Sequence, residues 1–124
     1  MDNTRNLTAY SPGLHLLVEM KGIRSGHLKD YRITKSLIDE MIDLLELNAL
    51  GSVYHNFEEG GFTAIVCLTE SHLSIHSWPE FGVVTADVFL SNYRNDNSEK
   101  ARGIMNSIIE LYQCTDYHIS EMFR

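Results

Sequence analysis

Residues 68–82 contain the feature that most restricts the fold and the chemistry of this chain. They read Leu-Thr-Glu-Ser-His-Leu-Ser-Ile-His-Ser-Trp-Pro-Glu-Phe-Gly. Because strand side chains alternate between faces, a strand over these residues places them in two sets on opposite faces of the sheet. One face carries His72, Ser74, His76 and Trp78, and the other carries Ser71, Leu73, Ile75 and Ser77. A strand that only fills a core carries branched apolar residues inside and ordinary polar ones outside. Imidazoles, hydroxyls and an indole on one face therefore indicate chemistry, and Pro79 ends the strand beyond them.

The other segments alternate between strand and helix patterns. Period-two segments predict strands over residues 13–20, 52–58, 62–69, 72–78, 83–90 and 116–123. Apolar residues at helical spacing predict one helix over residues 31–48, closing near Gly51, and another over residues 99–113. Residues 58–61 supply a hairpin turn, and the polar segment 92–98 offers Asp96 and Ser98 as capping residues.

This order of elements predicts an α+β fold. We expect a two-layer sandwich, with a mainly antiparallel sheet and two helices on one face. The other face is then solvated or covered by a partner. The chain has 124 residues and shows no internal linker, repeat or low-complexity stretch, so we predict a single domain over residues 1–124.

The composition of the chain argues against several classes of protein. Apolar residues make up 44% and charged residues 22%, which is typical of a globular protein and not of a disordered one. No apolar run reaches the roughly 18 residues of a membrane helix, and no secretion signal opens the chain, so we expect a cytoplasmic protein. The net charge of −7, without a basic cluster, argues against nucleic acid as a partner. Cys67 and Cys114 lack metal-ligand or disulfide spacing and are interpreted as buried thiols, and the sequence predicts no metal site.

Residues 70–80 closely resemble the self-processing site of bacterial and archaeal S-adenosylmethionine decarboxylases, and weaker similarity runs from Gly13 to the end of the chain. The resemblance implies autocatalytic cleavage between Glu70 and Ser71, giving a β chain of residues 1–70 and an α chain of residues 71–124. Ser71 would become a pyruvoyl group, the only cofactor. The resemblance also implies a homodimer built like a sandwich, with its sites near the interface.

Cleavage before a serine requires a carbonyl, a hydroxyl and a base. Glu70 supplies the carbonyl and Ser71 the hydroxyl. His76 is the candidate base, since imidazole titrates near neutrality. It lies a strand's length from Ser71, so the chain must bend or a neighbouring strand must intervene. The resemblance places the processing histidine at His76 and a helper hydroxyl at Thr63. The ketone would form a Schiff base with the substrate amine, the role of pyridoxal phosphate elsewhere.

Two further positions concern the substrate. Phe57 matches the family's phenylalanine that stacks on adenine, and Glu80 matches its glutamate that binds ribose hydroxyls. The resemblance thus implies decarboxylation of S-adenosylmethionine for polyamine synthesis, in particular spermidine.

Ser91 departs from the family pattern, which has a cysteine at this position that reprotonates the substrate. A hydroxyl is a far weaker acid than a thiol. Three explanations follow: Ser91 acts through a water or a neighbour, another donor such as His76 replaces it, or activity or substrate has diverged.

Alternatives stay open at this point. The same scaffold could decarboxylate arginine or ornithine, or the chain could be an inactive relative that assembles with a partner. A generic ligand-binding module would leave the Glu70-Ser71 pair unexplained. Single residues can also be explained without a function: Ser71 would then only start a strand, and Phe57 would pack in the core. In the same view Glu80 is a solvated turn residue, while His72 and His76 are bonded to neighbouring hydroxyls.

Overall fold

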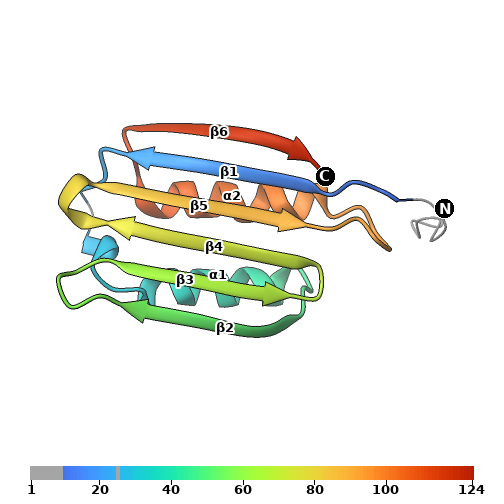
Figure 1. Cartoon of the computed structure of the whole chain (residues 1–124), viewed down its shortest axis with the longest axis horizontal. Coiled ribbons are helices and arrows are strands. Elements are labelled where there is room, and N and C mark those ends of the chain that lie inside the picture. The colour runs from blue at the N-terminus through green and yellow to red at the C-terminus, as the bar shows by residue number, and fades with distance from the viewer. Residues whose placement is uncertain (1–9, 25) are drawn as a thin grey trace.

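The structure is a computed structural model that describes residues 10–24 and 26–124 (Figure 1). The strands are β1 (Leu14–Lys21), β2 (Ala49–Asn56), β3 (Phe62–Leu68), β4 (Ser71–Trp78), β5 (Val83–Leu90) and β6 (Asp116–Phe123). The α-helices are α1 (Arg32–Leu44) and α2 (Ser98–Tyr112), and the short 3₁₀ turns are η1 (Gly26–Leu28) and η2 (Pro79–Phe81).

The strands form one sheet in the order β2-β3-β4-β5-β1-β6, and each neighbouring pair is antiparallel. Strand β1 therefore lies inside the sheet, between β5 and β6, although it comes first in the chain. The candidate strand β4 also lies inside the sheet, with β3 on one side and β5 on the other. Interior strands are held on both edges, so their side chains are rigidly positioned.

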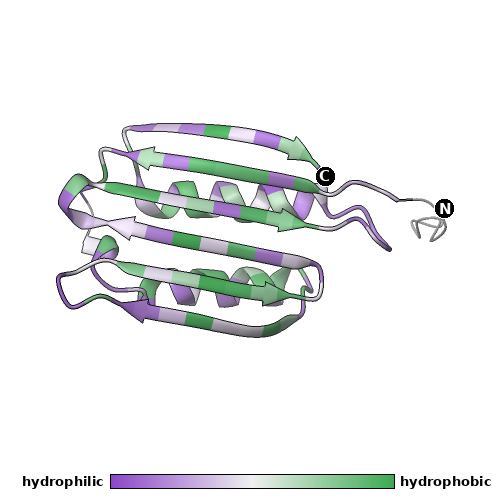
Figure 2. Cartoon of the chain, viewed as in Figure 1, coloured by the Kyte–Doolittle hydropathy of each residue, from purple (hydrophilic) through white to green (hydrophobic). Residues whose placement is uncertain are grey.

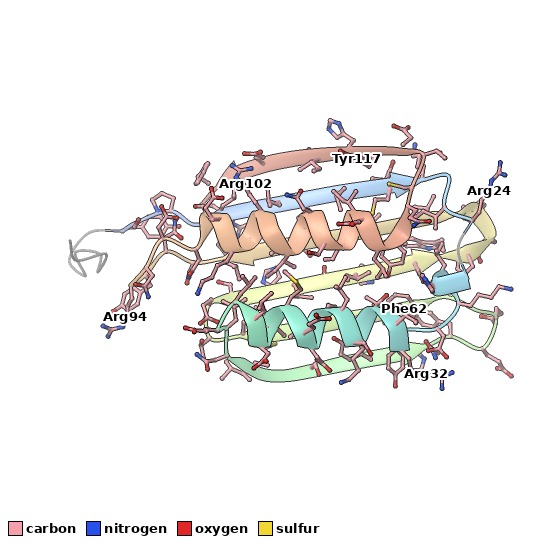
Figure 3. The ribbon with its side chains drawn as sticks, turned by 180° about the vertical axis from the view of Figure 1, so that it is seen from behind. Arg24, Arg32, Phe62, Arg94, Arg102 and Tyr117 are labelled. Carbon is pink, nitrogen blue, oxygen red and sulfur yellow. The ribbon has the colours of Figure 1, made fainter. Side chains whose placement is uncertain are left out.

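Both helices cover the same face of the sheet, as Figures 1 and 3 show from opposite sides. Residues at alternate positions of each inner strand turn toward the helices, and Figure 2 shows this alternation of hydropathy along the strands. On β5 the buried residues are Val84, Ala86, Val88 and Leu90, and on α2 they are Ala101, Ile104, Met105, Ile108 and Tyr112. Burial of these apolar surfaces between the two layers provides the main stabilisation.

The predicted fold class is confirmed, and the predicted strands and helices form. Two neighbouring boundaries are wrong: α1 ends at Leu44, not near residue 48, and β2 begins at Ala49, not at residue 52, so Gly51 lies inside β2. Glu46 has φ +57, and the Leu47 N–H donates to the Ile42 carbonyl at 2.9 Å, which closes the helix. The apolar pattern continues past the helix because the turn buries Leu47 in the same core.

The sheet face opposite the helices has no covering layer in the described part of the chain. It exposes large apolar side chains, among them Leu17, Val53, Ile65, Trp78 and Met122. Cys67 also lies there, exposed on β3, so its prediction as a buried thiol is wrong; Cys114 is half-buried. Local hydropathy around Cys67 did not reveal that odd positions of β3 point away from the helices. Neither described α-helix has the length and apolar character needed to cross a membrane.

Candidate active site

The predicted cleavage bond lies in the turn between β3 and β4, at one end of the sheet. Residues Leu68 and Ser71 pair across the strands, so Thr69 and Glu70 form the turn. The backbone carbonyl of Glu70 accepts a hydrogen bond from the Ser91 N–H at 2.6 Å. This short bond polarises the carbonyl and places an N–H donor where an attacked carbonyl oxygen would gain negative charge.

Ser71 has an unusual backbone conformation. Its φ of +139° lies in a region that L-amino acids rarely adopt, and such residues cost about 1–3 kcal/mol. Strand pairing with Leu68 on β3 and with Leu90 on β5 holds the residue in place despite this cost. Strain at the residue that follows the Glu70 carbonyl favours rearrangement of this peptide bond.

Ser91 lies beside the bond because β5 ends there. Its N–H donates to Glu70, and its carbonyl accepts from the Asn97 amide at 2.9 Å. The buried Asn92 side chain accepts from the Asn97 N–H at 2.8 Å, which fixes the loop between β5 and α2. A polar cavity of about 410 Å³ opens at this end and is lined by Glu70 and Ser91 among others. The structure thus brings Glu70, Ser71 and Ser91 together.

The other predicted residues gather at the opposite end of β4. Thr63 on β3 and His76 on β4 face each other across the two strands, and the Thr63 hydroxyl lies 2.6 Å from His76 Nδ1. A cavity of about 320 Å³ is lined by Phe57, Thr63, His76, Trp78 and Glu80. These five residues combine two aromatic rings, an imidazole, a hydroxyl and a carboxylate around one space.

The hairpin between β2 and β3 positions Phe57 at this cavity. The Phe57 N–H donates to the Gly61 carbonyl at 2.9 Å, and the Phe57 carbonyl accepts from Gly60 at 3.0 Å. Gly61 has φ +89, and a Cβ there would meet the Ser77 carbonyl at 2.9 Å. Only glycine allows the hairpin backbone to come this close to the Ser77 carbonyl with a positive φ. The Phe57 ring stays 46% exposed, with the His55 ring against it at 5.0 Å, so a flat ligand can reach it.

The structure does not bring Ser71 and His76 together within one chain. Strand β4 is continuous from Ser71 to Trp78, and each strand residue advances about 3.3 Å, so their backbones lie roughly 16 Å apart. The prediction that the chain bends, or that a neighbouring strand bridges the gap, is wrong for the single chain. The predicted site residues instead lie in two groups, which we name the cleavage half-site (Glu70, Ser71 and Ser91) and the binding half-site (Phe57, Thr63, His76 and Glu80). Trp78, which was not among the predicted site residues, lines the cavity of the binding half-site.

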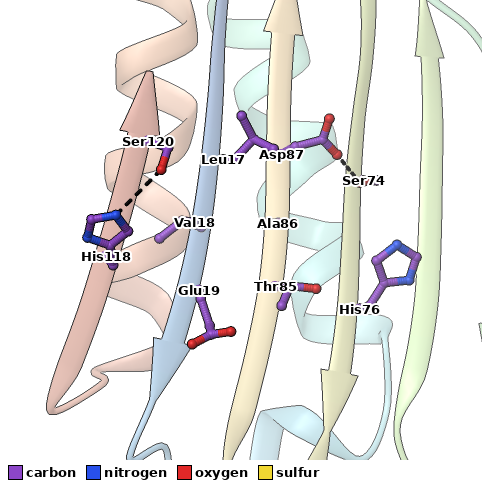
Figure 4. A pocket seen from close by; sticks show the side chains of 10 residues that line it. All are labelled: Leu17, Val18, Glu19, Ser74, His76, Thr85, Ala86, Asp87, His118 and Ser120. Carbon is purple, nitrogen blue, oxygen red and sulfur yellow. Dashed lines mark hydrogen bonds between the residues drawn. The ribbon is translucent and has the colours of Figure 1, made fainter. Parts of the chain in front are cut away.

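Sequence reasoning missed a third group of residues on the open face, which consists of His15, His72 and Asp87. A groove there is lined by Glu19, Ser74, His76, Thr85 and Asp87 among others (Figure 4). Burial by itself would raise the pKa of the Asp87 carboxyl, but hydrogen bonds from Ser74, His15 and His72 outweigh it, and this pKa lies below its usual value. The alternation of β5 places Asp87 on this face, but no sequence signal links it to His15 on β1.

This chain is similar to known proteins of one family in both sequence and fold. A family model described as S-adenosylmethionine decarboxylase matches residues 14–124. The S-adenosylmethionine decarboxylase proenzyme of Archaeoglobus fulgidus is 40% identical over 77 residues, which are 62% of this chain and 69% of that protein. The proenzyme of Thermodesulfovibrio yellowstonii is 32% identical over 115 residues, 93% of this chain and 82% of that protein.

A solved structure supports the same assignment. The crystal structure of the adenosylmethionine decarboxylase from Aquifex aeolicus superposes with a TM-score of 0.81 at 30% sequence identity, covering 94% of this chain and 92% of that chain. The match of the family model over nearly the whole described chain confirms the resemblance inferred from residues 70–80. This chain belongs to the S-adenosylmethionine decarboxylase family.

Proposed function

We propose that this chain is a proenzyme that cleaves itself between Glu70 and Ser71 and then decarboxylates S-adenosylmethionine to the aminopropyl donor of polyamine synthesis. The observation that carries the proposal is the Glu70–Ser71 bond itself. Its carbonyl is held by the Ser91 N–H at 2.6 Å, and its serine has a strained φ of +139°. Relatives that are 40% and 32% identical are named as proenzymes of this decarboxylase.

The cleavage uses only groups of the chain and water. The Ser71 hydroxyl oxygen attacks the Glu70 carbonyl carbon, the C–N bond breaks, and the nitrogen takes up a proton, so that an ester replaces the amide. A base then removes the Ser71 α-proton and the Glu70 carboxylate leaves, which ends the β chain at residue 70. The remaining dehydroalanine tautomerises to an imine, and water replaces its nitrogen as ammonia. The Ser91 N–H stabilises the oxyanion of the first step.

The residues at the turn fit a pyruvoyl group at position 71. The φ of +139° at Ser71 is one that L-residues rarely adopt, and conversion to a pyruvoyl group, which has no chiral α-carbon, would remove that strain. The neighbouring Glu70 and Ser91 line a cavity at this end of the sheet. A pyruvoyl ketone supplies an electron sink for the bond that loses carbon dioxide. Ser91 occupies the position of the family's proton donor, next to this group.

We infer that two copies of the chain complete each site. His76 is the candidate base, yet it lies roughly 16 Å from Ser71 in the same chain. The open sheet face exposes Leu17, Val53 and Ile65, apolar side chains that a second copy can cover. Two open faces can pack about a two-fold axis that lies between the sheets and perpendicular to the strands. The β4 strands of the two copies then run in opposite directions, so that the start of one lies over the end of the other. The binding half-site of one copy then lies over the cleavage half-site of the other.

The binding half-site suits a nucleoside with a nearby positive charge. Phe57 and Trp78 are 46% and 40% exposed, which leaves their rings free to stack on adenine and to attract a sulfonium. The Glu80 carboxylate lines the same cavity and can accept hydrogen bonds from two ribose hydroxyls. Arginine and ornithine could place a cation on one ring, but they have neither a purine to stack nor ribose hydroxyls for Glu80, so we favour S-adenosylmethionine over these amino acids.

The intact mass of the purified protein under denaturing conditions tests the proposal. We expect two fragments, residues 1–70 and residues 71–124, with the second lighter by one ammonia than a chain that starts with serine. The Ser71→Ala variant is the control and should stay whole. Carbon dioxide release is then compared for S-adenosylmethionine, arginine and ornithine. A wild-type chain that stays uncut after long incubation would contradict the proposal and favour an inactive partner subunit.

A further inference from the structure

Three strands bring two histidines and an aspartate together on the open sheet face. His15 on β1 and His72 on β4 both pair with Phe89 on β5, from its two sides. Asp87 lies two residues along β5 and therefore points to the same face. His15 and Asp87 are 72 residues apart in the sequence, so only the pairing of β1 with β5 joins them. Figure 4 shows Asp87 of this group with its neighbour Ser74.

The three side chains converge on one oxygen atom. His15 Nε2 lies 2.7 Å and His72 Nε2 lies 2.9 Å from Asp87 Oδ2. His15 is only 8% exposed, and the Asp87 side chain is 19% exposed. One ligand atom from each of the three residues lies within 4.8 Å of the others. Two imidazole nitrogens and a carboxylate oxygen in this arrangement are the ligand types that zinc takes in proteins.

Neighbouring residues orient these ligands. The Ser74 hydroxyl donates a hydrogen bond to Asp87 Oδ1, which leaves Oδ2 to face the imidazoles. The Phe89 ring packs against both imidazoles, at 4.9 Å from His15 and 5.8 Å from His72. A hydrogen-bonded carboxylate and an apolar wall are the surroundings that hold metal ligands in position. All five residues sit on interior strands, where little movement is possible.

We propose that His15, His72 and Asp87 bind one divalent transition-metal ion of the zinc class. Three protein ligands leave a fourth position for water or for a group of the facing copy. Magnesium and calcium prefer oxygen ligands throughout, so two imidazoles select against them. The ion would tie β1, β5 and β4 together across the sheet. His72 follows Ser71 directly in β4, so the ion would lie near the cleavage bond, but the site goes beyond the proposed function, which requires no metal.

Cobalt titration of the whole protein tests the site, because Co²⁺ takes the same ligands and gives a visible spectrum that reports its geometry. The protein is made without a histidine tag, treated with a chelator and titrated with Co²⁺ at neutral pH, and Zn²⁺ is then added. We expect one Co²⁺ per chain with the intense absorption of a four-coordinate ion, displaced by Zn²⁺ and not by Mg²⁺.

Variants separate the site from surface histidines. His15→Ala and Asp87→Asn should abolish the absorption, while His118→Ala, an exposed histidine outside the cluster, should leave it unchanged. Ser74→Ala keeps all three ligands and should weaken Co²⁺ binding by about tenfold to a hundredfold. Circular dichroism establishes that each variant is folded. If Asp87→Asn is unfolded, His15→Ala and Ser74→Ala decide the outcome.

Two results would overturn the proposal: wild-type protein that binds no Co²⁺, or binding that persists in both His15→Ala and Asp87→Asn. The measurement does not depend on the decarboxylase. The Ser71→Ala chain, which cannot form a pyruvoyl group, should bind Co²⁺ as tightly as wild type. Failure of self-cleavage and failure of the metal site are therefore distinguishable.

Discussion

At residue 71 an L-amino acid holds a backbone conformation that few L-amino acids adopt, and its preceding carbonyl is held by the N–H of Ser91. The two features act on one bond: strain raises the energy of the intact peptide, and the N–H lowers the energy of the attacked carbonyl. Neither depends on the side chain of residue 91. A serine at that position therefore leaves cleavage possible, and we expect its effect to fall on the later protonation step.

Replacement of Ser91 by cysteine tests that distinction. Ser91→Cys supplies a thiol, a much stronger acid than a hydroxyl, beside the pyruvoyl position. We expect kcat for carbon dioxide release to rise by about 10²-fold or more, the contribution typical of a positioned general acid, with self-cleavage unchanged. Ser91→Ala is the matched control and keeps the backbone N–H. If neither variant changes kcat, another group protonates the substrate carbon.

Single strands and helices set the distance between the two half-sites and hold the helical layer together. Strand β4 is long enough to place its two ends in different sites, and its alternation sends Leu73 and Ile75 into the core while His72 and His76 face outward. Helices α1 and α2 are joined by a buried contact between the Thr34 and Tyr112 hydroxyls. Both residues are fully buried, so this hydrogen bond holds the helical layer in place.

The Thr34–Tyr112 pair predicts a dependence of stability on alkaline pH. Burial raises the pKa of Tyr112 from 10.0 to about 12, although the hydrogen bond with Thr34 acts in the opposite direction. A folded pKa above the unfolded value means that this stabilisation is present below pH 10 and is lost as the pH rises toward 12.

We therefore compare wild type with Tyr112→Phe. The variant should be less stable by about 1 kcal/mol near neutral pH, because the Thr34 hydroxyl loses its partner. Near pH 11 ionisation of Tyr112 in the unfolded chain lowers the wild-type stability by about 1.4 kcal/mol, so the wild-type advantage should vanish or slightly reverse. Urea denaturation at both pH values measures the difference. A difference that stays constant with pH would contradict the assignment. Wild type and Tyr112→Phe share all other ionising groups, so the contributions of those groups to the pH dependence of stability cancel in the difference.

At the scale of the whole molecule, the two half-sites lie at opposite ends of one sheet, and the apolar open face lies between them. A single chain cannot place His76 against Ser71, whereas a second copy facing it in the opposite strand direction can. This arrangement predicts that the residues of one site come from two chains.

Mixed dimers test this prediction. Ser71→Ala and His76→Ala should each prevent self-cleavage when expressed alone. When the two variants are co-expressed with different mass tags, one site contains Ser71 from the His76→Ala chain and His76 from the Ser71→Ala chain. Mass spectrometry should then find the His76→Ala chain cut and the Ser71→Ala chain whole. If neither chain is cut in the mixture, the base does not come from a second copy.

Much of the fold was accessible from the sequence. The strands, both helices, the hairpin turn and the two faces of β4 follow from periods of two and about 3.6 residues and from turn residues, which are local signals. The predicted end of α1 is too late, because Leu45 and Leu47, which follow the helix, are apolar and also pack in or against the core. Cys67 was misplaced, because hydropathy alone does not tell which face of a strand the helices cover.

The candidate bond for cleavage, the residues that share a face of β4 and the family that the chain resembles can all be inferred from the amino-acid order, since each lies within a short segment. The hydrogen bond between Glu70 and Ser91, the separation of Ser71 from His76 and the contact between His15 and Asp87 become visible only in the folded chain. The physical reason is strand pairing. Which strands become neighbours, and in which register, depends on contacts between residues far apart in the chain, and no local pattern contains them.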